Sequence, residues 1–239
     1  VDRLADRRSL LSGLDRLNRD VDRSGLMQGL DEFEQQAFSL VLGKAPEAFD
    51  LKKEDPRVLA RYGINDGQDN RRRRRGGLGE QMLMARRLCE VGCGFVTIHF
   101  GGWDMHGNIK RGMDNLGPQV DHAVATFLDD VAQRGMSDNI LLVITGEFGR
   151  TPRVKRNAGR DHWAPLSTLA LAGGGLKMGQ VVGESNSKAE VPKSTPITPQ
   201  DLMATIFHTL NIDQKIQFPS QAGRPTFMNE NGKTIVELV

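Results

Sequence analysis

Two apolar runs separated by a long amphipathic helix most constrain the fold of this chain. Residues 95–100 (FVTIHF) and 140–145 each read as a short buried strand, and residues 116–132 carry apolar side chains at helical spacing. A strand, a helix and a strand in this order form a βαβ unit, in which the strands run parallel and the crossover is right-handed. The pattern therefore predicts an α/β domain built on a parallel sheet.

Further helices and a third strand are predicted around this βαβ unit. The other helical patterns cover residues 4–21, 26–42, 56–62 and 78–91. Residues 167–172 (STLALA) read as the third strand. One more helix is expected to begin after Thr198, because Thr198 can cap it while Pro199 and Asp201 suit its first turn.

The length of the chain indicates a single domain. Its 239 residues suffice for one sizeable α/β domain but are too few for two independent ones. Within it we expect a helical region at 1–66, an Arg/Gly-rich loop at 67–79 and an α/β core at 80–239. The chain opens at Val1 with neither an initiator methionine nor a signal-peptide pattern, which suggests a mature product or a fragment.

Composition and charge argue against a membrane protein and against a nucleic-acid-binding protein. No run approaches the ~20 apolar residues of a membrane span, and the net charge is only +2. The five arginines from Arg71 to Arg75 could contact a polyanion, but without interleaved aromatic residues or a second basic patch a solvated loop is the simpler interpretation. Cys89 and Cys93 are too few for a disulfide framework or a zinc site, and we expect them to be small buried residues.

Each strand of the predicted βαβ unit leads directly into residues that can bind metals or anions. Asp104 and His106 come after the first strand, and Glu147 and Arg150 come after the second. Parallel strands end at the same sheet edge, where open α/β sheets place their sites, so we expect these side chains to lie together. Alone, an Asp-x-His pair is more often a turn cap with a locally bonded imidazole, and Glu147 could simply pair with an arginine.

A third polar set, Arg160-Asp161-His162, follows closely in the chain. We take Asp161 and His162 as further candidate ligands, although a turn with a packed histidine would explain them equally well. Carboxylates and imidazoles suit Zn²⁺, Mn²⁺, Mg²⁺ or Ca²⁺, any of which can polarise a phosphoryl or sulfuryl oxygen and activate water. Arg150 and Arg160 would offer planar forks to an oxyanion.

Three segments of this polar region carry a family resemblance. Residues 102–106 (GWDMH), 146–152 (GEFGRTP) and 159–163 (GRDHW) resemble the bacterial domain-of-unknown-function 1501 family. Shorter matching segments lie at 85–88, 172–175, 199–201 and 223–225, so that the resemblance spans nearly the whole chain.

The resemblance implies a fold, an ancestry and a location. Because that family is placed among alkaline-phosphatase and sulfatase-like proteins, it implies a doubly wound, mostly parallel sheet with flanking helices and a divalent-metal ester-hydrolase ancestry. Relatives are longer at the N-terminus and often start with an export signal. The resemblance therefore also implies a periplasmic or secreted protein whose nucleophile lies outside this C-terminal part. Where many superfamily members have an Asp-His pair, this chain has Glu147-Phe148.

Three functions remain open from the sequence. The first is a metal-dependent hydrolase of a small phosphate or sulfate ester, with Asp104, His106, Glu147, Asp161 and His162 as ligands and Arg150 and Arg160 steering the anion. The second is a non-catalytic binding or scaffold protein of the cell envelope on the same fold. The third, nucleic-acid binding through the five arginines, is the weakest. The sequence does not specify the oligomeric state.

Overall fold

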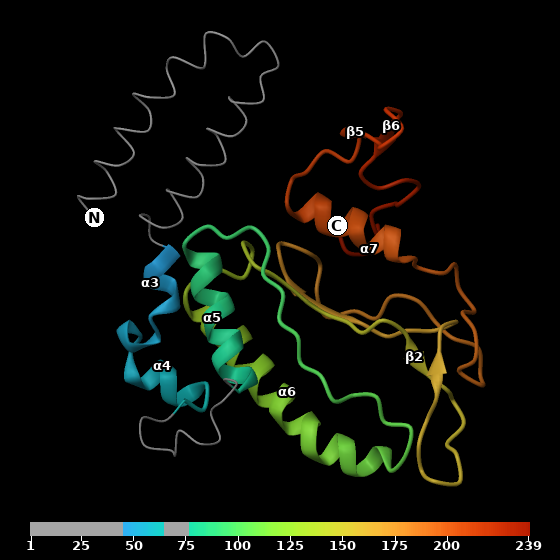
Figure 1. Cartoon of the computed structure of the whole chain (residues 1–239), viewed down its shortest axis with the longest axis horizontal. Helices are drawn as coiled ribbons and strands as arrows, with labels where there is room; N and C mark the ends of the chain where they lie inside the picture. Colours follow the sequence, from blue (N-terminus) through green and yellow to red (C-terminus); the bar gives the residue numbers. More distant parts are fainter. Residues whose placement is uncertain (1–44, 65–76) are drawn as a thin grey trace.

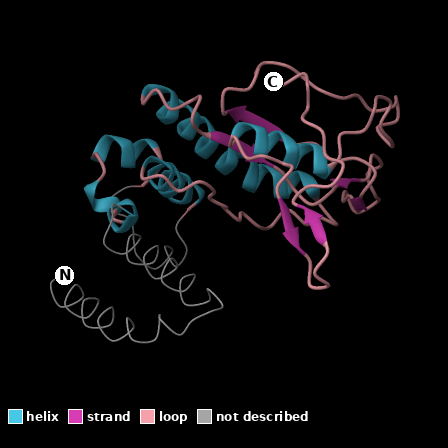
Figure 2. Cartoon of the chain, turned by 90° about the horizontal axis from the view of Figure 1, so that it is seen from above, coloured by secondary structure: helices cyan, strands magenta, loops and turns pink. Residues whose placement is uncertain are grey.

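The structure, a computed structural model, describes residues 45–64 and 77–239 of the chain (Figure 1). The helices predicted at 4–21 and 26–42 and the run of five arginines lie outside the described residues. Figure 2 shows a group of helices together with short strands that are joined by long loops. None of the helices in the described ranges combines the length and the hydropathy that a bilayer crossing requires.

The described elements follow one another from a helical part to a part rich in loops and short strands. In chain order they are α3 (Ala45–Phe49), η1 (Leu51–Lys53), α4 (Pro56–Arg61), α5 (Leu78–Glu90), α6 (Ile109–Gln133), β1 (Leu141–Ile144), β2 (Gly149–Arg150), β3 (His162–Trp163), β4 (Ala170–Gly173), α7 (Pro199–Thr209), β5 (Gln217–Pro219) and β6 (Pro225–Phe227). The helices predicted at 56–62, at 78–91 and after Thr198 are confirmed as α4, α5 and α7.

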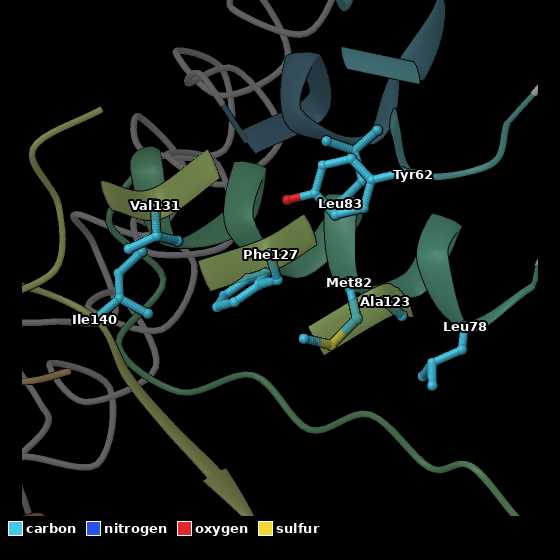
Figure 3. Packing of buried hydrophobic residues seen from close by; sticks show 8 residues of the cluster. All are labelled: Tyr62, Leu78, Met82, Leu83, Ala123, Phe127, Val131 and Ile140. Carbon is cyan, nitrogen blue, oxygen red and sulfur yellow. The ribbon is translucent and has the colours of Figure 1, made fainter. Parts of the chain in front are cut away.

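The main hydrophobic core lies between α5 and α6, which pack side by side (Figure 3). Met82 and Leu83 of α5 meet Ala123 and Phe127 of α6, and all four side chains are buried. The spacing of four residues on α6 places its apolar side chains on one face, as an amphipathic helix requires. The helix predicted at 116–132 is therefore confirmed, but it begins earlier, at Ile109.

A buried ionic network surrounds Arg86 at the edge of this core. The Arg86 side chain is only 1% exposed, and its guanidinium contacts Glu54 at 2.6 Å, Glu90 at 2.5 Å and Asp130 at 3.0 Å. Tyr62 Oη donates to the same Asp130 carboxylate at 3.0 Å. Burial raises the pKa of Glu54, but hydrogen bonds from Arg87 and Arg86 outweigh burial, and the net pKa is lowered. The network joins the region before α5 to both core helices.

The strand predicted at 95–100 is wrong. This segment has no regular secondary structure, although Val96, Ile98 and Phe100 are half-buried in alternation with exposed neighbours, as in a strand with one covered face. Ile98 and Phe100 pack against the main core, whereas Phe95 is 67% exposed. Among the described residues, however, no other strand forms a hydrogen-bonded ladder with it. The apolar pattern therefore predicted correctly which side chains of this segment are partly buried. It could not show that the segment lacks a pairing partner in the described part of the chain.

Strand β1 pairs with β4 in antiparallel register, with Leu141 opposite Gly173 and Ile144 opposite Ala170. The third predicted strand thus exists at the end of its predicted range. Within the described ranges the three sheets are all two-stranded and antiparallel, so the doubly wound parallel sheet remains a prediction.

Helix α7 and the C-terminal residues complete the fold. Thr198 and Asp201 form the reciprocal capping box that the sequence indicates. Buried Thr205 accepts a hydrogen bond from the backbone N–H of Ile235, which anchors the C-terminal segment to α7. Ile235 and Leu238 then form a second small core with Leu176.

We predict that Arg86→Met lowers the free energy of unfolding by about 3 kcal/mol, because it leaves buried carboxylates without one of their cationic partners. Lys53→Met is the control. The Lys53–Glu47 pair is exposed, so its loss should cost less than about 1 kcal/mol. Urea denaturation of both variants measures the difference. Equal losses would show that the buried network does not stabilise the helical part.

Candidate metal centre

A short hairpin places Arg150 and His162 on the same face. Strand β2 pairs with β3 in antiparallel register, with Gly149 opposite Trp163 and Arg150 opposite His162. Side chains of directly opposed residues in an antiparallel pair project to the same side. The hairpin therefore brings together the two sequence segments that carry most of the candidate ligands.

Both of these side chains converge on Asp104. The Oδ1 atom of Asp104 lies 2.8 Å from His162 Nε2 and 2.7 Å from an Nη atom of Arg150. His106 Nε2 lies 3.0 Å from the same oxygen. One possible ligand atom from each of Asp104, His106 and His162 lies within 4.8 Å of the other two. We call these three residues the Asp-His-His cluster.

Asp161 contacts the cluster through His106 and is not one of its three residues. His106 Nδ1 lies 2.9 Å from Asp161 Oδ1, while the opposite ring nitrogen, Nε2, faces Asp104. Lys155 Nζ donates to the same Asp161 oxygen at 2.7 Å. A carboxylate on one nitrogen of an imidazole fixes the ring and directs the other nitrogen to the site, as in many metal proteins.

The loop between β2 and β3 holds the Asp104–His106 segment in place. The backbone N–H of Asn108 donates to Asn157 O at 2.9 Å, and that of Ile109 donates to Ala158 O at 2.8 Å. The Asn157 side-chain amide donates to His106 O at 3.0 Å. These bonds also satisfy N–H groups at the start of α6, which have no partner within the helix. Figure 1 shows the start of α6 beside this hairpin.

Gly159 permits this close contact between the loop and the ligand segment. A Cβ atom at position 159 would lie 1.9 Å from His106 O and 2.5 Å from Gly107 N, which is far inside van der Waals contact. Only a residue without a side chain fits there, since both neighbours are backbone atoms. The glycine of the GRDHW segment therefore serves the backbone geometry of the site.

The electrostatics of the site favour ionised carboxylates. The hydrogen bond from His162, followed by that from Arg150, lowers the pKa of Asp104 to about 2. Hydrogen bonds from Lys155 and then His106 lower the pKa of Asp161. The ring of Phe148 packs on the His162 ring, with centroids 4.3 Å apart. Phe148 thus supports a cluster residue although it cannot itself bind a metal.

The other predicted site residues lie elsewhere. Glu147 is exposed, stands outside the Asp-His-His cluster and makes no hydrogen bond or ion pair with the residues that the structure describes. Arg160 donates to the carbonyls of Thr151 and Pro152 at 2.8 Å and 3.1 Å, which stabilises the hairpin loop. Arg150 also donates to Trp103 O at 3.1 Å. Neither arginine has the free guanidinium expected of an anion-binding residue.

The sequence interpretation missed Lys155, Asn157 and Gly159. Asn157 and Gly159 contact His106, about fifty positions earlier in the chain, and local patterns do not reveal such contacts. Lys155 contacts Asp161, six positions later. The GRDHW motif was a signal for Gly159, since a glycine beside ligand residues often marks close backbone approach. Lys155 and Asn157 carried no such signal.

The Asp-His-His cluster is open to solvent. The side chains of Asp104, His106 and His162 are 66%, 45% and 49% exposed, respectively. One carboxylate and two imidazoles form a donor set suited to a divalent ion, and three protein ligands would leave coordination positions for water or substrate. The donor chemistry therefore fits a catalytic type of metal site better than a closed structural one.

We predict that Gly159→Ala destabilises the protein by about 2 kcal/mol or more, because the new Cβ forces the loop off the ligand segment. Gly117→Ala is the matched control. It lies within α6 with nothing within 4 Å of its added Cβ, so it should stabilise the helix by about 0.5–1 kcal/mol. Chemical denaturation compares the two, and equal effects of both substitutions would contradict the close approach.

Comparison with known proteins places the chain in a family. A family model described as "Protein of unknown function (DUF1501)" matches residues 2–239. No curated protein and no solved structure matches the chain. Because the match covers almost the entire sequence, including every residue of the Asp-His-His cluster, the protein belongs to this family.

Proposed function

We propose that the Asp-His-His cluster binds a divalent metal ion and that the protein is a hydrolase of phosphate or sulfate esters. The observation that carries the proposal is the convergence of Asp104, His106 and His162, whose possible ligand atoms lie within 4.8 Å of one another. Asp104 and His106 belong to one segment and His162 to another, and hydrogen bonds between residues 106–109 and the loop of the hairpin hold the two segments together.

The donor set narrows the choice of ion. Two imidazoles and one carboxylate favour Zn²⁺ or Mn²⁺ over Mg²⁺ and Ca²⁺, which prefer oxygen ligands. When bound, such an ion would polarise an ester oxygen and lower the pKa of a coordinated water. Asp161 would keep His106 oriented through Nδ1, so that Nε2 remains directed to the ion.

Arg150 would change partners on metal binding. Asp104 Oδ1 has three nitrogen neighbours within 3.0 Å, from His162, Arg150 and His106. A carboxylate oxygen has only two lone pairs, and a metal ion bound there would compete directly with the guanidinium. Once released, the planar fork of Arg150 could bind the oxyanion of an ester. This gives Arg150 the role that the sequence suggested, but only in the metal-bound protein.

Family resemblance supplies the remaining parts of the proposal. Placement of the family among alkaline-phosphatase and sulfatase-like proteins would make the substrate a small anionic ester. It would also make the complete fold a doubly wound, mostly parallel sheet. The same resemblance supports a periplasmic or secreted location.

A second candidate is a non-catalytic binding or scaffold protein of the cell envelope. The observation that favours it is the Asp104–Arg150 ion pair at 2.7 Å, which already neutralises the carboxylate without a metal. Arg160 likewise contributes to loop structure. In this case the cluster would be a hydrogen-bond network that holds the hairpin against the start of α6, and added metal would not change the Tm.

We predict that Zn²⁺ or Mn²⁺, at a concentration of about 100 times its Kd, raises the Tm by about 5–10 °C. His106→Ala and His162→Ala should each abolish most of this rise by removing an imidazole ligand. His122→Ala, an exposed position on α6, and Glu147→Ala should retain it. Differential scanning calorimetry with and without each ion makes the measurement.

Several outcomes would contradict the proposal. The absence of a Tm rise in the unsubstituted chain with every one of the four ions would favour the scaffold candidate. A rise that persists in both histidine variants would place the ion at another site. Loss of the rise in Glu147→Ala would bring that carboxylate into the ligand set, contrary to its position in the structure.

We predict that Asp161→Asn weakens metal binding about 10- to 100-fold, because an amide orients and polarises His106 less well than a carboxylate. Asp114→Asn is the matched control, since among the described residues Asp114 pairs with the exposed Lys110 on α6 alone. Isothermal titration with Zn²⁺ measures both affinities. Unchanged affinity in Asp161→Asn, with loss of binding in His106→Ala, would remove Asp161 from the site without removing the metal.

A further inference from the structure

The two arginines expected to bind an anion are both occupied by the protein. Arg150 contacts Asp104 and the carbonyl of Trp103, and Arg160 contacts the carbonyls of Thr151 and Pro152. A guanidinium that already donates to carbonyls has fewer N–H groups left for a ligand. Other cationic side chains are therefore better placed to bind an anion beside the cluster in the metal-free protein.

Three other arginines belong to the segments that build the cluster. Arg153 and Arg156 lie on the loop between β2 and β3, and Arg111 lies in the first turn of α6. All three residues are exposed. Among the described residues, none of the three side chains makes a hydrogen bond or an ion pair. By contrast, the nearby cations Lys110 and Lys155 are paired with Asp114 and Asp161.

Backbone contacts bring these arginines close to the ligand segment. Arg156 directly precedes Asn157, whose side chain donates to His106 O at 3.0 Å. Arg111 follows Ile109, whose N–H donates to Ala158 O at 2.8 Å. Arg156 therefore lies one residue from the contact between the hairpin loop and His106, and Arg111 lies two residues from the contact between the start of α6 and the same loop. Because Gly159 permits close backbone packing there, the arginines extend from an ordered base.

The charge around the cluster is far more basic than the chain as a whole. The segments 103–111 and 146–163 contain seven Lys or Arg residues and three Asp or Glu residues, whereas the whole chain has a net charge of only +2. An excess of unpaired positive charge at the edge of a site attracts anionic ligands and raises their local concentration. If these residues served only to keep the surface solvated, there would be no reason for the positive charge to concentrate on the two segments that build the cluster.

We propose that Arg111, Arg153 and Arg156 form a second anion-binding subsite beside the Asp-His-His cluster. Its ligands would carry several tetrahedral oxyanion groups, so that one group reaches the cluster while others contact these arginines. This inference extends the proposed hydrolase function, because it gives the substrate class as polyanionic. It rests on that function only where it places one group of the ligand at the cluster for reaction. Binding at the arginines requires no metal.

The experiment measures binding of myo-inositol hexasulfate to the metal-free protein by isothermal titration in the presence of EDTA. The triple variant Arg111→Gln/Arg153→Gln/Arg156→Gln should bind about tenfold or more weakly, with a shallower dependence on salt. The control variant Lys52→Gln/Arg57→Gln/Arg224→Gln removes the same charge from exposed positions elsewhere and should bind as the unsubstituted chain does. Inorganic sulfate, which has one oxyanion group, should bind much more weakly than hexasulfate.

Equal losses in the two triple variants would overturn the subsite, because general surface charge would then explain binding. Tighter binding of a DNA duplex than of hexasulfate at the same salt concentration would also overturn it. A parallel titration with myo-inositol hexakisphosphate tells whether sulfate or phosphate groups are preferred. Because metal is absent throughout, failure here leaves the metal proposal intact, and failure of the metal titrations leaves this result standing.

Discussion

The buried guanidinium of Arg86 is the interaction on which the packing of α5, α6 and the segment before α4 depends. It contacts Glu54 before α4, Glu90 at the end of α5 and Asp130 near the end of α6. A buried charge is costly unless its partners are present, so a packing that removes one of these carboxylates from Arg86 is disfavoured. Helix α6 has 25 residues and is about 37 Å long. Its C-terminal end is held by this network, and its N-terminal end contacts the candidate site.

Local patterns in the sequence predicted α4, α5, α6 and α7. The capping residues of α7 and the apolar spacing of α5 and α6 act within a few residues, so a sequence displays them directly. The start of α6 was missed because Gly112, Gly117 and Pro118 weaken the helical pattern there. Its first turn relies instead on carbonyls of residues 157 and 158. The prediction of a strand at 95–100 was wrong because a strand needs a pairing partner elsewhere in the chain. The pattern of the segment itself cannot show whether that partner exists.

The polar segments of the candidate site were also identified from the sequence, but their roles were not. Asp161 and His162 are adjacent, and neighbouring side chains in an extended segment point in opposite directions. One therefore reaches His106 from the outer side while the other reaches Asp104. Glu147 follows β1 as predicted, yet it remains outside the cluster, whereas Arg150 and His162 face each other across the hairpin and both contact Asp104. Spacing in the sequence could not distinguish these outcomes.

Residues 95–100 pair with no other strand among the described residues, and this affects how the candidate site can lose its structure. The segment that leads into Asp104 and His106 has no sheet to hold its backbone among the described residues. Beyond the packing of Ile98 and Phe100 on the core, its position depends on bonds to the hairpin loop. If that loop separates from the start of α6, Asp104, His106 and His162 lose their common geometry in a single step. The three side chains would therefore lose and regain their arrangement together, in one cooperative local unfolding step, rather than separate from one another in turn.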